Sequence, residues 1–262
     1  MNITNNTILI TGGTSGIGLE LAAQLLKLGN TVIITGREQS RLDAARKNLP
    51  KVHTLQSDVS DPKAMTLLFE KVTKDFPELN VLVNNAGIMR KINLHDTGKD
   101  LEDLSREIET NLTGPVRMVR QFLPHLKAQK AAAIVNVSSG LAFVPFPISP
   151  IYCAAKAGVH SFTQSLRVQL KNTRVKVFEL APPATQTPLL TGDFNADDVK
   201  GGAVMDVAKL VGQTIKGLKN DQLEIRPGLS NILKLMSRLA PQFILNQLSK
   251  PVDAMLAQIT PR

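Results

Sequence analysis

Residues 7–18 read Thr-Ile-Leu-Ile-Thr-Gly-Gly-Thr-Ser-Gly-Ile-Gly, an apolar run that passes directly into a glycine-rich turn. The run from Thr7 to Thr11 is typical of a short buried strand, and apolar residues at helical spacing from Ile17 predict a helix behind the turn. Such a turn lets backbone N–H groups approach a pyrophosphate at the helix N-terminus. The spacing G-x-x-x-G-x-G differs from G-x-G-x-x-G, but its place between a strand and a helix favours a dinucleotide site.

Strands and helices alternate along the rest of the chain. Further strands are predicted at 31–35, 52–56, 80–84, 133–137, 174–180 and 223–225, and helices at 17–28, 39–48, 61–75, 99–128, 151–170 and 206–218. This alternation indicates an α/β fold of the Rossmann type, a doubly wound parallel sheet of about seven strands with helices on both faces. We expect one domain over residues 1–262, with a helical C-terminal extension at 227–262 packed on it. Gly114-Pro115 and Pro124 predict bends in the helix at 99–128.

Composition excludes several classes of protein. One cysteine excludes a disulfide framework and a multi-thiolate zinc site, and the four histidines show no metal-ligand spacing, so we expect no metal. Residues 131–155 carry no charge, but their prolines and polar side chains exclude a lipid-exposed helix. The N-terminus lacks the layout of a signal peptide, so we expect a cytoplasmic protein without a membrane span.

The excess of basic residues, which gives the chain a formal net charge of +9, lies in one segment. Residues 110–178 contain no acidic residue and nine basic ones, which equals the excess of the whole chain. Such a field concentrates anionic ligands, although a solvated basic face is the plain alternative for most of these side chains. We expect no nucleic-acid partner, because the basic residues are spread thinly and nine Phe, one Tyr and no Trp offer few stacking platforms.

The end of the second predicted strand bears on the choice of cofactor. NAD-binding proteins place a carboxylate there for the ribose 2′-hydroxyl. This chain has Thr35-Gly36-Arg37, 19 residues after Gly18. A guanidinium fork suits a 2′-phosphate, so we predict NADP(H) rather than NAD. A plain surface arginine is the alternative, and the carboxylate of Glu38 could still reach a hydroxyl.

A second chemical pattern is Tyr-Cys-Ala-Ala-Lys at residues 152–156. Positions i and i+4 share a helix face, so Tyr152 and Lys156 project together. A neighbouring ammonium favours the phenolate and lowers the pKa of a phenol from its ordinary value of about 10. Ser138 and Ser139 end the fifth predicted strand, at the sheet edge where ligands bind. An ordinary exposed helical pair is the alternative for Tyr152 and Lys156.

With these motifs the chain resembles the classical short-chain dehydrogenase/reductase family over nearly its whole length. The matching features are the Thr-Gly-x-x-x-Gly-Ile-Gly turn at 11–18, Asp58, Asn-Asn-Ala-Gly at 84–87, Asn111, and Ser139 thirteen residues before the Tyr-x-x-x-Lys of 152–156. Residues 175–183 are similar to a bacterial branch, the DltE-like oxidoreductases, whose substrates are largely undefined. The resemblance also implies a homodimer or homotetramer formed through the helices at about 115–129 and 151–170. We expect Arg117, Arg120, Lys127, Arg167 and Lys171 at the rim of that interface or in water.

The resemblance implies roles for four catalytic residues. Tyr152 would give or take the proton, and Ser139 would orient and polarise the carbonyl oxygen. Lys156 would hold the nicotinamide ribose and lower the phenol pKa, and Asn111 would position a water in a relay ending at Lys156. Together with Arg37, the implied cofactor-binding residues are Gly12, Thr14, Ser15, Gly16, Ile17, Gly18, Asp58, Val59, Asn85, Ala86, Gly87, Tyr152, Lys156, Pro182 and Thr187. One departure is Pro183, where the family has glycine.

These residues predict an NADP(H)-dependent oxidoreductase of the EC 1.1.1.- type that interconverts a carbonyl and an alcohol on a small molecule. The alternative is a non-catalytic NADP(H) sensor on the same fold, and the joint presence of all four catalytic residues favours the enzyme. A serine hydrolase is not favoured, because the chain has no G-x-S-x-G elbow. The residues predicted to line an apolar or mixed substrate pocket are Met89, Leu141, Phe143, Val144, Phe146, Leu189, Leu190 and Phe194.

Overall fold

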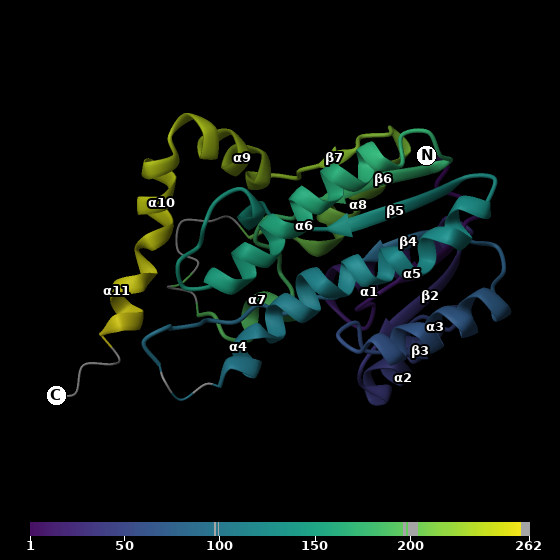
Figure 1. Cartoon of the computed structure of the whole chain (residues 1–262), viewed down its shortest axis with the longest axis horizontal. Coiled ribbons are helices and arrows are strands. Elements are labelled where there is room, and N and C mark those ends of the chain that lie inside the picture. Colours follow the sequence, from purple (N-terminus) through teal and green to yellow (C-terminus); the bar gives the residue numbers. More distant parts are fainter. Residues whose placement is uncertain (97, 99, 196–197, 199–203, 258–262) are drawn as a thin grey trace.

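Parallel strands in the order β3-β2-β1-β4-β5-β6-β7 form one sheet in the computed structural model, which describes residues 1–96, 98, 100–195, 198 and 204–257 (Figure 1). The strands are β1 (Thr7–Ile10), β2 (Thr31–Gly36), β3 (His53–Gln56), β4 (Leu79–Asn84), β5 (Ala132–Val137), β6 (Val175–Leu180) and β7 (Glu224–Ile225). The sequence therefore predicted the fold class correctly. Because every pair is parallel, all carboxyl ends of the strands meet at one edge of the sheet.

Helices cover both faces of the sheet, since successive side chains of each strand point to opposite sides. Ile8 and Ile10 belong to a core shared with α1 (Gly16–Lys27), α2 (Gln39–Asn48) and α8 (Val207–Lys219). Leu9 belongs to the opposite core, shared with α3 (Pro62–Asp75), α5 (Gly114–Ala128) and α6 (Pro150–Gln169). The sheet is thus buried on both faces, as its apolar strands require.

The predicted long helix before β5 is built from three pieces. α4 (Leu101–Ile108) passes into a π-helical turn, η1 (Glu109–Thr113), and then into α5. The predicted bend near Gly114 is therefore a change of hydrogen-bond register, because Gly114 opens α5 immediately after the wide turn. A Cβ at Gly114 would lie 2.9 Å from the carbonyl oxygen of Val59, so this close approach requires glycine. At Pro124 the helix continues to Ala128 without interruption.

The C-terminal segment forms three helices, α9 (Leu229–Leu239), α10 (Pro241–Ser249) and α11 (Pro251–Leu256). Proline begins both α10 and α11, where its missing N–H group costs no helical hydrogen bond. Figure 1 shows these helices beyond the same end of the sheet as α4 and the short α7 (Pro188–Thr191). The segment therefore lies on the side of the molecule that carries the strand carboxyl ends.

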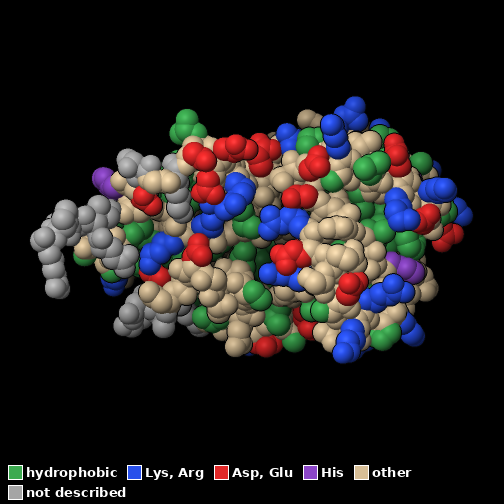
Figure 2. Space-filling model, turned by 90° about the horizontal axis from the view of Figure 1, so that it is seen from below, with side chains coloured by type: hydrophobic (Ala, Val, Ile, Leu, Met, Phe, Trp, Pro, Cys, Tyr) green, Lys and Arg blue, Asp and Glu red, His purple; other side chains and the backbone are tan. Residues whose placement is uncertain are grey.

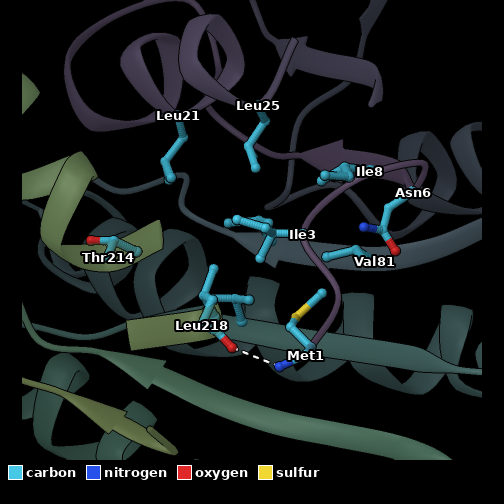
Figure 3. Close-up of a pocket in the computed structure, with 11 residues that line it drawn as sticks. Met1, Ile3, Asn6, Ile8, Leu21, Leu25, Val81, Thr214 and Leu218 are labelled. Carbon is cyan, nitrogen blue, oxygen red and sulfur yellow. Dashed lines mark hydrogen bonds between the residues drawn. The ribbon is translucent and has the colours of Figure 1, made fainter. Parts of the chain in front are cut away.

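The structure has a small apolar cavity inside the protein core. It is lined by side chains of the α1 and α8 side of the sheet, with Leu21, Leu25 and Thr214 among them, and by Met1, whose amino group donates to Leu218 O at 2.7 Å (Figure 3). These apolar walls belong to the core, so we assign the cavity no chemical role. Within the described residues, no helix combines the length and the apolar character that crossing a membrane would need.

Candidate active site

The glycine turn between β1 and α1 is held by the loop that follows β4. Gly12 and Gly16 adopt left-handed backbone conformations, with φ of 65° and 53°. A Cβ at Gly12 would lie 2.7 Å from Ala86 Cα, so only glycine allows this approach. The Asn85 amide donates to the carbonyl oxygens of Thr11, at 2.9 Å, and Gly12, at 3.0 Å. The 84–87 motif thus fixes the shape of the turn.

The start of α1 is chemically suited to an anion. Ser15 is the N-cap residue but makes no side-chain capping bond, and the first turn contains no acidic residue. The first N–H groups of a helix lack partners within the helix and carry partial positive charge, so they attract phosphate. A Cβ at Gly16 would lie 3.1 Å from Thr187 Cγ2, which places Thr187 beside the turn. This cradle fits a dinucleotide pyrophosphate.

The predicted nucleoside end of the site lies beyond β2 and β3. Arg37 is exposed at the end of β2. Glu38 forms an ion pair with Arg41, with 2.9 Å between Oε2 and Nε. Asp58 accepts hydrogen bonds from the backbone N–H of Ser60, at 2.8 Å, and from its hydroxyl, at 2.7 Å. The one carboxylate that could compete for a ribose hydroxyl near Arg37 is thus already paired with a guanidinium.

Tyr152, Lys156 and Ser139 come together at the carboxyl end of β5. Tyr152 and Lys156 are buried on the same face of α6, as their spacing predicts. Ser139 caps the short 3-10 helix η2 (Gly140–Ala142), and its hydroxyl is close enough to the phenol of Tyr152 to lower the phenol pKa. Lys156 Nζ donates to Val137 O at 2.8 Å and lies 5.7 Å from the centre of the Tyr152 ring. A phenol, a hydroxyl and an ammonium therefore share one buried site.

Asn111 reaches the same site from the π-helical turn. Its side-chain oxygen accepts from the backbone N–H of Ile88 at 2.9 Å, and its side-chain nitrogen donates to Ile88 O at 2.7 Å. A Cβ at Gly87 would lie 3.0 Å from Asn111 Oδ1 and 3.6 Å from Lys156 Nζ. Glycine at position 87 therefore leaves room for Asn111 and Lys156 to approach each other.

Burial dominates the electrostatics of the site. Burial raises the pKa of Tyr152 well above its ordinary value; the Ser139 hydrogen bond lowers it, and nearby Cys153 and Glu107 raise it. Burial also lowers the pKa of Lys156 to about 8. The net change in the pKa of Tyr152 is thus opposite to the lowering expected from the neighbouring ammonium. The physical reason is that desolvation of the phenolate outweighs the attraction of a cation whose own charge is disfavoured.

An apolar cluster surrounds Tyr152. It contains Phe146, Ile148, Cys153 and Phe194, and the rings of Phe146 and Phe194 are stacked with centroids 6.4 Å apart. Of the predicted pocket residues, Met89 and Leu141 also pack against it. Val144 is buried elsewhere, Phe143 contacts His160, and Leu189 is 37% exposed. The cluster is therefore only part of the predicted pocket.

The C-terminal helices add three side chains to this cluster that sequence reasoning missed, namely Leu248, Val252 and Met255. The apolar residues of the C-terminal segment predicted that it packs on the domain. They did not predict the surface against which it packs. Tyr152 itself is only 5% exposed. The C-terminal helices thus help to close the space around the phenol.

The loop with the unusual proline keeps its contacts to the site. The backbone N–H of Gly140 donates to Pro182 O at 2.7 Å, and the Thr185 hydroxyl donates to Pro183 O at 2.8 Å. Proline removes a donor but leaves its carbonyl oxygen available. Pro183 is therefore compatible with a path that brings Thr187 to the glycine turn.

The charged side chains of the described residues indicate neither a metal site nor, on the face shown in Figure 2, a surface of a single charge. Among the described residues, no three His, Cys, Asp or Glu side chains form a group that could hold a metal ion. Basic and acidic side chains are interspersed on the face shown in Figure 2. That face therefore presents no broad surface of a single sign.

Comparison with known proteins gives consistent matches. The short chain dehydrogenase family matches residues 6–198, which is most of the chain. The chain is 52% identical over 189 residues to the uncharacterized oxidoreductase DltE of Bacillus subtilis (strain 168), covering 72% of this chain and 75% of that protein.

Solved structures show the same fold. A short chain dehydrogenase from Burkholderia cenocepacia J2315 in complex with NADP has a TM-score of 0.81 at 24% identity, with all of both chains covered. A short chain dehydrogenase/reductase from Burkholderia phymatum in complex with NAD has a TM-score of 0.80 at 22% identity, covering 90% of this chain and 94% of that one. These two structures show that the chain shares their architecture; one of them holds NADP and the other holds NAD.

Proposed function

The chain belongs to the short-chain dehydrogenase family, and we propose that it is an NADP(H)-dependent oxidoreductase that interconverts a carbonyl and an alcohol on a small molecule. The observation that carries this proposal is the meeting of Tyr152, Ser139, Lys156 and Asn111 at the strand ends beside the glycine turn. A binding protein would need the turn but not these four groups in one buried place.

The proton chemistry belongs to Tyr152. Because burial raises its pKa, the phenol holds its proton near neutral pH and is ready to donate it to a carbonyl oxygen. The hydroxyl of Ser139 lies beside the phenol, so an oxygen bound between these two hydroxyls would be polarised by both. Lys156 Nζ lies 5.7 Å from the centre of the phenol ring, and Asn111 and Lys156 both lie beside Gly87, so a relay through these two side chains would return a proton to Tyr152. A bound cofactor supplies the hydride.

The cofactor site favours NADP(H). Backbone N–H groups of the turn and the start of α1 would hold the pyrophosphate, with Thr14, Ser15 and Thr187 beside it. Arg37 is exposed and would pair with the 2′-phosphate, while Arg41 pairs with Glu38. Because this ion pair is exposed to solvent, it weakens the repulsion between Glu38 and a phosphate only slightly, and the preference for NADP rests on Arg37.

The substrate side is apolar. Phe146 and Phe194 form one wall around Tyr152, and Leu248, Val252 and Met255 of the C-terminal helices form another. Such walls suit the hydrocarbon body of a carbonyl compound, with Tyr152 and Ser139 as the convergent polar groups. We infer that the reacting molecule carries an aliphatic or aromatic body.

The proposal also includes association of identical chains through α5 and α6, as the family resemblance implies. Val116 on α5 and Val168 on α6 are exposed apolar residues of that helical layer. Arg117 is bound to Glu109 at 3.0 Å, and Arg167 donates to Val177 O and Leu223 O. Two of the five basic residues expected at the rim are thus occupied within their own chain.

The central test is turnover with a carbonyl panel. We expect NADPH oxidation with at least one apolar aldehyde or ketone, and a loss of kcat of about a thousandfold in Tyr152→Phe, because the proton donor is removed. The affinity of Tyr152→Phe for NADPH, measured by calorimetry, should stay within about threefold of the parent, since the variant loses one hydroxyl and keeps the ring and the other cofactor-binding residues. NADPH binding without turnover of any panel compound would instead support a sensor.

Arg37 provides the test of cofactor choice. The parent protein should bind NADP more tightly than NAD, and Arg37→Asp should lower NADP affinity about tenfold or more by removing one charge-assisted contact and adding repulsion. NAD affinity should change little in the same variant. Lys27→Asp, at the far end of α1, is the matched charge control. Equal binding of both cofactors by the parent would contradict this part of the proposal.

A further inference from the structure

Glu179 is a carboxylate without exposed surface, near the carboxyl end of the strand next to the sheet edge formed by β7. It lies on β6, and its neighbours in register are Asn136 on β5 and Glu224 on β7. A buried carboxylate is unfavourable unless it is paired and hydrogen-bonded. Its contacts are therefore informative, and the reaction outlined above makes no use of them.

Two side chains form hydrogen bonds with the carboxylate of Glu179, and they come from different elements. His160 on α6 places Nδ1 2.8 Å from Glu179 Oε2 and 3.0 Å from Oε1. Ser138, at the end of β5, donates its hydroxyl proton to Oε1 at 2.5 Å. His160 is 18% exposed at its side chain and Ser138 is 2% exposed, so water competes little for these bonds. Glu179 thus ties α6 to the end of β5.

Each partner adjoins a catalytic group. Ser138 directly precedes Ser139, so the bond to Glu179 restrains the backbone from which the catalytic hydroxyl projects. His160 follows Lys156 by four residues and Tyr152 by eight, which places the three side chains on one face of α6. The distance between Ser139 and Tyr152 therefore depends on how α6 is held against β5.

We propose that Glu179 and His160 form a positioning pair that keeps Ser139 and Tyr152 in register for catalysis. This inference rests on the function proposed above. The pair touches neither substrate nor cofactor in this account, and it acts through Ser138 on one side and through α6 on the other. A misplacement of catalytic groups by about 1 Å can lower a rate about a hundredfold, so a small shift of β5 against α6 has a large effect.

Kinetics of two variants test the pair. Ser138→Ala removes one hydroxyl and leaves Glu179 and His160 in contact. Glu179→Gln leaves an uncharged amide whose single oxygen can serve only part of the original contacts. With the panel compound that the parent reduces best, each variant should lower kcat about ten- to hundredfold while KM stays within about twofold, because alignment is lost and binding is not. The double variant should be no slower than the slower single variant, since both changes break one unit.

The matched control is Glu224→Gln on the neighbouring strand. Glu224 pairs with Lys234 and Arg226 and has no bond to Ser138. This variant makes the same chemical change directly beside Glu179 in register, and its kcat should remain within about twofold of the parent. An equal loss in Glu224→Gln would show that any disturbance of this region slows the enzyme, and would overturn the proposal.

A readout that needs no substrate separates this inference from the proposed function. The chain contains one tyrosine, so a carbon-13 label at tyrosine Cζ gives a single NMR signal from Tyr152. Because the hydroxyl of Ser139 lies close enough to the phenol to influence its pKa, Ser139→Ala should move this signal. Ser138→Ala and Glu179→Gln should move it in the same direction, and Glu224→Gln should leave it in place. If the Tyr152 signal of Ser138→Ala and Glu179→Gln keeps the chemical shift of the parent, the positioning role is overturned. This holds whether or not the parent turns over any carbonyl compound.

Discussion

At the scale of single residues, burial governs the chemistry of the site. Tyr152 and Lys156 are both almost fully buried, and desolvation favours the neutral form of each. The spacing of Ser139, Tyr152 and Lys156 could be predicted from sequence, because i and i+4 always share a helix face. The directions of the pKa shifts could not, since they depend on how tightly Phe146 and Phe194 close over the phenol.

The lowered pKa of Lys156 predicts a pH dependence of stability. Folding lowers this pKa from 10.5 to about 8, so the folded chain binds fewer protons here than the unfolded chain. Stability therefore rises with pH as the folded lysine loses its proton, and the penalty of burying an ammonium is fully present below pH 8. From about pH 7 to about pH 9, Lys156 should add about 1 kcal/mol to the free energy of unfolding.

Urea unfolding of the parent and of Lys156→Met at about pH 7 and about pH 9 measures this contribution of Lys156 to the free energy of unfolding. The difference between the two free energies of unfolding should move in favour of the parent by that amount as the pH rises. Burial raises the pKa of Cys153 to about 11, and this contribution is shared by both proteins and cancels. A difference that does not change with pH would show that Lys156 keeps its ordinary pKa in the folded chain.

At the scale of elements, the strands and most helices form where the hydrophobic pattern predicts them. The structure differs from the prediction where contacts between distant parts of the chain determine the local conformation. β1 and α1 are fixed by the apolar run and the glycine turn, so residues 7–18 predicted them well. The π-helical turn around Asn111 could not be predicted, because a change of hydrogen-bond register leaves no periodic signature. Likewise, the sequence of α10 and α11 indicates helices but does not say that Leu248 and Val252 pack against the apolar cluster that contains Tyr152.

The C-terminal helices should contribute to substrate binding and not to cofactor binding. Val252→Asp places a carboxylate in the apolar cluster at Tyr152, and with acetophenone or benzaldehyde it should raise KM about tenfold, because the apolar wall becomes hydrated. NADPH affinity should stay within about twofold, since α11 lies outside the glycine turn.

Gln247→Asp is the matched control, because Gln247 is an exposed residue of the neighbouring helix α10. Its KM should equal that of the parent, and circular dichroism should show that both variants are folded. If Val252→Asp leaves KM unchanged while Gln247→Asp behaves as the parent, the C-terminal helices are not part of the substrate site.

At the scale of the whole molecule, charge and apolar surface make opposite contributions to association. The acid-free segment at 110–178 supplies α5 and α6, so identical copies meeting there bring like charges together. Arg120, Lys127 and Lys171 are exposed, whereas Arg117 and Arg167 are bonded within the chain. An interface on these helices therefore has to place its apolar residues at the centre and leave the free basic side chains in water.

This arrangement predicts the response of the oligomer to substitution and to salt. Val168 is 66% exposed, and Val168→Asp should convert the proposed dimer or tetramer into monomers, because a charge at the centre of an interface loses its hydration. Lys127→Ala, at the rim, should leave the assembly intact. Raising the salt concentration from about 0.05 M to about 0.5 M should strengthen association, since screening weakens the repulsion between like charges. Light scattering after size-exclusion chromatography measures the molar mass of the assembly in each of these three experiments. A monomeric parent, or dissociation by salt, would mean that α5 and α6 do not form the interface.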